Sequence, residues 1–108
     1  MKVTGKKGLE LYYEINGYQN VIEPLLIQSL SIKTRYRLNK LNKKLKEELE
    51  EIEKIKSQLD IESPDYVKSV EELYSQEIEL PDYNFTLDDF DFNTDQNYQA
   101  IFEILINE

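Results

Sequence analysis

The residues best suited to chemistry fall into two clusters, one acidic and one basic. In the acidic run DFDFNTDQNYQA, residues 89–100, every second side chain near the start carries a ligand oxygen: Asp89, Asp91, Asn93, Asp95 and Asn97. Their spacing matches positions 1, 3, 5, 7 and 9 of a calcium-binding loop. The glycine needed at position 6 is Thr94, and the glutamate needed at position 12 is Ala100. We therefore predict no metal site and interpret the run as an extended segment with its acids outward, followed by a helix cap.

The basic cluster lies in KTRYRLNKLNKK, residues 33–44, with Tyr36 among its cations. Those cations are Lys33, Arg35, Arg37, Lys40, Lys43 and Lys44. Cations interleaved with an aromatic ring can bind phosphates. The whole chain, however, carries a formal net charge of −9, so a nucleic acid would meet net repulsion. We expect this cluster to contact a protein rather than a nucleic acid.

Several residue types that enzymes rely on are missing. The chain has no Cys and no His, so thiol chemistry, a Ser-His-Asp arrangement and the commonest transition-metal ligands are excluded. Its three glycines form no phosphate-binding loop. Carboxylates, Lys, Arg and Tyr remain, in a chain with little irregular structure to build a cleft. We predict a non-enzymatic protein with no catalytic residues, no metal and no cofactor.

Charge is divided unevenly along the sequence. Residues 1–59 hold 12 Lys and Arg against 8 Asp and Glu, whereas residues 60–108 hold 1 against 14. Such a chain can neutralise itself by folding back or by pairing head to tail with a second copy. We expect an acidic surface to lie near the basic cluster, in the same subunit or in a neighbour, and its residues are Asp82, Asp88, Asp89 and Asp91.

A long helix must position the basic cluster. Apolar residues at helical spacing predict an amphipathic helix over residues 31–60, with Ser31 as its N-cap. The apolar stripe consists of Leu38, Leu41, Leu45, Leu49, Ile52, Ile55 and Leu59. Part of the stripe recurs at intervals of seven, as in a coiled coil. It is therefore either an intramolecular core or a subunit interface.

The remaining segments predict one mainly α domain, residues 1–108. We expect N-terminal helical segments at about 6–29, a second helix at 63–76 that forms an antiparallel hairpin with the first, an extended β-ribbon at 77–92 and a C-terminal helix at 94–107. Residues 9–15 fit a helix or a hairpin strand. We favour the helix because Leu9, Tyr12 and Tyr13 share one helical face.

Two segments resemble a set of small bacteriophage and prophage proteins. The first begins the long helix and matches at Leu30, Ile32, Lys33, Thr34, Leu38, Lys40 and Leu41. The second matches at Glu72, Leu73, Glu77, Ile78, Glu79 and Leu80. The likeness runs from about residue 9 onward, although Ser31 stands where proline is frequent in those proteins, and the link between the helices is short. It implies a phage origin and brings no catalytic residues, because those proteins have no assigned activity.

Together these features predict a non-enzymatic phage protein that forms homo-oligomers through the apolar stripe and contacts other phage or host proteins. We expect a minor virion or assembly component, found in the host cytoplasm or the virion. No apolar run reaches the roughly 18 residues that cross a bilayer, and no signal region is present, so we expect neither secretion nor a membrane partner. The alternative is an anti-defence inhibitor that binds a host protein or sequesters a small signalling ligand.

Overall fold

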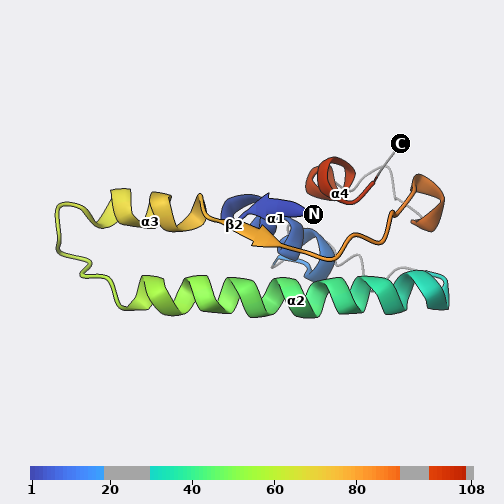
Figure 1. Ribbon diagram of the computed structural model, residues 1–108, viewed down its shortest axis with the longest axis horizontal. Coiled ribbons are helices and arrows are strands. Elements are labelled where there is room, and N and C mark those ends of the chain that lie inside the picture. Colours follow the sequence, from blue (N-terminus) through green and yellow to red (C-terminus); the bar gives the residue numbers. More distant parts are fainter. Residues whose placement is uncertain (19–29, 91–97, 107–108) are drawn as a thin grey trace.

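The computed structural model describes residues 1–18, 30–90 and 98–106, which form an elongated body of 47 × 28 × 21 Å. Its elements in chain order are β1 (Lys2–Thr4), α1 (Gly5–Asn16), α2 (Ile32–Ser57), α3 (Tyr66–Tyr74), β2 (Glu77–Glu79), the 3-10 turn η2 (Leu87–Asp89) and α4 (Gln99–Ile104). Helix α2 forms one long edge of the molecule, and the other elements all lie on one side of this helix (Figure 1). The predicted mainly α fold, with a helical hairpin and a small antiparallel ribbon, is confirmed.

Helix α2 begins where the sequence predicts and ends slightly earlier. The Ser31 hydroxyl accepts the backbone N–H of Thr34 at 3.1 Å, which satisfies one of the free amides of the first turn. The last helical residue is Ser57, whereas the expected end was residue 60. A turn follows in which the N–H of Glu62 donates to the Asp60 carboxylate at 3.0 Å.

Helix α3 runs back along α2 and completes the hairpin (Figure 1). It begins at Tyr66 rather than at residue 63, and it ends at Tyr74. The Ser63 hydroxyl accepts the N–H of Asp65 at 3.2 Å, so this serine stabilises the preceding turn and does not cap the helix. No residue of α3 is buried, which makes the hairpin arm thin.

The two-stranded ribbon has a different second strand from the expected one. Strand β2 pairs antiparallel with β1 at the N-terminus, and Val3 lies opposite Ile78. The ladder continues with the N–H of Leu80, which donates to the Met1 carbonyl at 2.8 Å. Pro81 has no N–H to extend it. Phe90 lies outside any strand, and residues 91–97, which include Phe92, lie outside the described residues.

Residues 9–15 are helical, in agreement with the favoured alternative. Thr4 caps α1, since its hydroxyl accepts the N–H of Lys7 at 3.2 Å. The helix ends at Gly17, whose φ of 87° falls in the left-handed region that favours glycine. The rest of the expected N-terminal helical segments, residues 19–29, lies outside the described residues.

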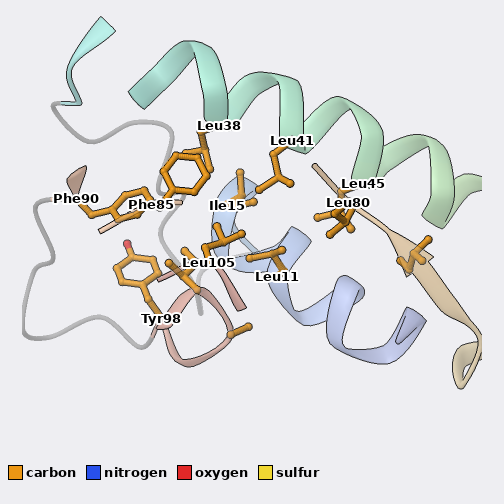
Figure 2. Packing of buried hydrophobic residues seen from close by; sticks show 13 residues of the cluster. Leu11, Ile15, Leu38, Leu41, Leu45, Leu80, Phe85, Phe90, Tyr98 and Leu105 are labelled. Carbon is orange, nitrogen blue, oxygen red and sulfur yellow. The ribbon is translucent and has the colours of Figure 1, made fainter. Parts of the chain in front are cut away.

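The core lies where the first half of α2 packs on α1 (Figure 2). Leu11 and Ile15 of α1 face α2, whose contributions to the cluster are Leu38, Leu41 and Leu45. Gly8 permits this close approach: a Cβ there would lie 2.8 Å from Ile78 and 3.2 Å from Leu45. Side chains from the later half of the chain close the cluster, and they are Ile78, Leu80, Phe85, Phe90, Tyr98, Ala100, Ile101 and Leu105.

Helix α4 is held by a buried acid of α1. The Glu14 carboxylate accepts the N–H groups of Ala100 and Ile101 at 2.9 and 3.2 Å. This contact supplies the N-terminal cap that α4 lacks in its own sequence. The helix covers Gln99–Ile104, and residues 94–97 and 107 of the expected helix 94–107 lie outside the described residues. Phe102 is 46% exposed, whereas Ala100, Ile101 and Leu105 are buried and form the side of this segment that faces the core.

Candidate functional site

The apolar stripe of α2 is mainly intramolecular core. Leu38, Leu41 and Leu45 are fully buried within one subunit, and Ile52 is nearly so. Leu49 and Leu59 are half-buried. Ile55, near the end of α2, is 42% exposed, and the helix that runs beside this end, α3, has no buried residue. The residues expected as oligomer contacts are thus largely occupied, and a subunit interface must use another surface.

The opposite face of α2 carries a second repeat, which we name the outer stripe. It consists of Tyr36, Lys40, Lys43, Glu47, Glu50 and Lys54, all exposed. Their steps of four and three give two interleaved series at intervals of seven, the spacing of a coiled-coil seam. Helix α2 itself forms one long edge of the molecule (Figure 1). Sequence reasoning missed it because only apolar residues were tested for this spacing.

Charge changes sign at the middle of the outer stripe. Lys40 and Lys43 precede the midpoint, whereas Glu47 and Glu50 follow it. Lys43 and Glu47 form no ion pair within the described part of the chain, and Glu50 reaches Lys46 only at 4.0 Å. Such exposed pairs are worth about 0.2–1 kcal/mol. The charges of the stripe therefore remain available to a partner.

An aromatic contact begins the outer stripe. The Lys40 ammonium lies 5.0 Å from the ring centroid of Tyr36, within the range of a cation–π interaction. The ring is 60% exposed, and Ile32, one turn earlier, is 88% exposed. The start of α2 thus presents apolar area beside its cations.

The other cations of the basic cluster lie beside the outer stripe. Lys33 and Lys44 are exposed, and Arg35 and Arg37 are half-buried. Lys44 forms an ion pair with Glu48 at 3.1 Å. The six cations therefore do not share one face of α2. Their spacings within residues 33–44 place them at different angles around the helix.

The expected acidic surface is only partly assembled. Asp82 shares a hollow of about 760 Å³ with Lys40, Lys43 and Lys44. Its carboxylate accepts the N–H of Asn84 at 3.0 Å. Asp88 and Asp89 lie in η2, in the half of the molecule that holds the start of α2 (Figure 1). Asp91 lies outside the described residues.

Of the calcium-loop pattern, the structure describes residues 89–90 and 98–100. The Asp89 carboxylate accepts the N–H of Thr86 at 2.8 Å and so stabilises the η2 turn. No group of three or more acids within residues 1–18, 30–90 and 98–106 is arranged to hold a metal ion. Most of the remaining pattern, residues 91–97, lies outside the described residues.

A cleft lies between α1, α2 and α3, and we name it the α1–α3 cleft. Its volume is about 660 Å³, and its wall includes Lys6, Leu9, Lys56, Val70, Glu71 and Tyr74. A smaller hollow of about 200 Å³ shares Leu9 and Tyr74 and extends toward Tyr12 and Tyr13. No sequence pattern indicated this cleft, because its residues come from separate elements of the chain.

Tyr74 is the aromatic residue that lines both hollows. Its hydroxyl donates to the Glu53 carboxylate on α2 at 3.3 Å, which fixes the ring against α2. Burial raises the pKa of Tyr74, and the neighbouring Glu53 charge raises it further. The ring therefore stays neutral at physiological pH and can serve as an apolar surface.

Comparison with known proteins identifies no relative. No protein-family model, no curated protein and no solved structure matches the chain. Among the described residues, no helix combines the length and apolar character needed to span a membrane. The functional argument therefore rests on the surfaces described above.

Proposed function

We propose that this protein is a non-enzymatic phage protein whose copies assemble through the outer stripe of α2, as a minor virion or assembly component. The observation that supports assembly is the sign change of charge at the middle of the stripe. The proposed phage origin rests on the resemblance of the helix start and of the Glu72–Leu80 segment to small phage proteins. The same surface would serve contacts with other phage or host proteins.

A second copy fits the outer stripe when its α2 runs antiparallel. With the two-fold axis at the level of residue 45, Lys43 faces Glu47 of the copy and Lys40 faces Glu50. Tyr36 then faces Lys54, a further cation–π pair. Two-fold symmetry makes each of these contacts twice. A parallel arrangement would instead oppose like charges, so the pattern favours the antiparallel one.

The assembly is expected to be weak and sensitive to salt. Helix α2 has 26 residues and is about 39 Å long at 1.5 Å per residue, so the seam is long but mostly polar. Ion pairs at an exposed seam contribute little each, and screening reduces their contribution further. The apolar stems of the lysines and the Tyr36 ring supply the remaining buried area.

Charge reversal provides the test. The variant Lys40→Glu/Lys43→Glu makes the stripe acidic along its centre, and Glu47→Lys/Glu50→Lys makes it basic. Each variant alone is expected to be monomeric, because two copies of the same variant would place like charges opposite each other. An equimolar mixture is expected to form a heterodimer in which every opposed pair is complementary. Sedimentation velocity at low salt measures all three states.

The control is Lys2→Glu/Lys68→Glu, which changes the net charge equally on exposed lysines away from α2. It should self-associate like the wild type. Monomeric wild-type protein at low salt would exclude assembly through this seam. So would a mixture of the two reversed variants that fails to associate.

Mass spectrometry of purified phage particles tests the biological role. A virion component is expected in the particles, at a fixed ratio to the head or tail proteins that accompany it. An assembly component is expected in partly built particles. A protein that appears early in infection and is absent from all particles would contradict this role and favour the anti-defence alternative.

A further inference from the structure

The α1–α3 cleft combines an apolar wall with two cations. Leu9 of α1 and Val70 and Tyr74 of α3 supply the apolar surface. Lys6 of α1 and Lys56 of α2 line the same space. A volume of about 660 Å³ lies within the range of small-molecule sites.

The cleft is locally positive in an acidic protein. Its two lysines outnumber its one carboxylate, Glu71, whereas the chain as a whole carries −9. Neither lysine forms an ion pair within the described part of the chain. The neighbouring Lys7 does not line the cleft, and it pairs with Glu103 at 2.9 Å. A net positive site of this kind favours an anionic ligand.

The hydroxyl groups in the cleft already have partners. The Thr4 hydroxyl accepts the N–H of Lys7 at 3.2 Å, and the Ser75 hydroxyl donates to the Glu72 carbonyl at 2.7 Å. The Tyr74 hydroxyl donates to Glu53, outside this cleft. Polar recognition therefore falls mainly to the two lysines.

The aromatic surface is held in position for a flat ligand. The bond to Glu53 fixes the Tyr74 ring, and the Lys56 ammonium lies 5.9 Å from its centroid. An anionic group drawn to Lys56 would therefore bring the body of the ligand close to this ring. Ring–ring and ring–aliphatic contacts with Tyr74, Leu9 and Val70 would then bury that body.

We infer that the α1–α3 cleft binds a small aromatic anion, with its flat ring against Tyr74 and Val70 and its anionic group between Lys6 and Lys56. Phosphate, sulfonate and carboxylate groups share this chemistry. Such a site goes beyond self-association and would suit sequestration of a small signalling ligand. It does not depend on the outer stripe, so either proposal can fail alone.

The test titrates adenosine 5′-monophosphate and 1-naphthalenesulfonate into isotope-labelled protein, followed by amide chemical shifts. At least one probe is expected to give saturable shifts concentrated at Lys56, Val70 and Glu71. Lys6→Gln and Lys56→Gln should each weaken binding about tenfold through loss of one charged contact. Adenosine and inorganic phosphate, each with half of the required chemistry, should bind at least about tenfold more weakly than the nucleotide.

The matched control is Lys68→Gln, which removes the same charge from an exposed position of α3 outside the cleft. Its affinity should equal that of the wild type, and Lys40→Glu/Lys43→Glu should also retain binding. The inference is overturned if neither probe saturates these shifts up to about 1 mM, a weak affinity even for a small ligand. It is also overturned if Lys68→Gln weakens binding as much as Lys56→Gln does.

Discussion

Replacing Leu45 by aspartate is expected to unfold the protein. The Leu45 side chain has no solvent exposure and lies at the centre of the contact between α1 and α2. Aspartate would lose the buried apolar area and place a carboxylate without a partner in the core. The loss should be about 5 kcal/mol or more, comparable with the total stability of a small domain. Circular dichroism during thermal and urea unfolding measures the effect.

The control for Leu45→Asp is Lys46→Asp, which places the same side chain one residue later on the exposed face. Its cost should stay within about 1 kcal/mol, mostly from helix propensity. Leu45→Ala should fall between them, at about 2–5 kcal/mol, because it leaves only a cavity. A stable, folded Leu45→Asp protein would contradict the assignment of the apolar stripe to the core.

Replacing Glu14 by alanine is expected to cost about 2–4 kcal/mol and to release α4 first. The change leaves the N–H groups of Ala100 and Ile101 without their acceptor, and each buried unsatisfied N–H costs about 1–3 kcal/mol. Native-state hydrogen exchange should therefore speed up at these two amides before the rest of the core. Glu10→Ala, one turn earlier, removes only an exposed ion pair with Lys7 and should cost less than about 1 kcal/mol.

The same carboxyl group gives the stability a distinctive pH dependence. Burial raises the pKa of Glu14 above its ordinary value of 4.5, although the two backbone N–H groups oppose that shift. Its contribution is therefore fully present below pH 4.5 and is lost as pH rises through the raised pKa. The unfolding free energy of the wild type, minus that of Glu14→Gln, should therefore decrease as pH rises from 4.5 through the raised pKa. A constant difference from about pH 4 to pH 7 would contradict a raised pKa.

The sequence predicted the elements of the fold better than their contacts. Helix α2 is recognisable because its apolar residues keep helical spacing from Leu38 to Ile55, roughly five turns, and Ser31 supplies a cap. The fold class follows from that helix and the break after it. The start of α3 was misplaced because Ser63 can serve either a turn or a helix, and only the turn geometry decides between them.

Contacts between distant segments were not predictable from local pattern. Strand β1 has only three residues, too few to show the alternation of apolar and polar residues that indicates a strand. The predicted ribbon at residues 77–92 therefore lacked the true partner of β2, which is β1. The α4 cap comes from Glu14, about 86 residues away in sequence, where a single acid in an amphipathic helix carries no sign of its role. Val67 of α3 is 67% exposed, although its apolar side chain alone would favour burial.

For the candidate surfaces, too, the residue types could be predicted from the sequence, whereas their arrangement in space could not. The basic cluster was visible in the sequence, whereas its distribution around α2 depends on which face the core occupies. Once Leu38 and Leu45 fix that face, Lys40, Lys43, Glu47 and Glu50 fall together on the outside. The α1–α3 cleft required the hairpin and α1 to be placed relative to each other, which no spacing rule supplies.

The position of α1 also determines when the protein can fold. Strand β1, which precedes α1, pairs with β2, more than 70 residues later in the sequence. Glu14 of α1 binds the start of α4 near residue 100. The α2–α3 hairpin is local in sequence but buries no residue of α3, so it gains little stability alone. Non-local closure of this kind slows folding and makes it cooperative. During synthesis, α1 can meet α2 early, whereas the bonds between Glu14 and α4 are expected to form only after residues 98–106 have left the ribosome.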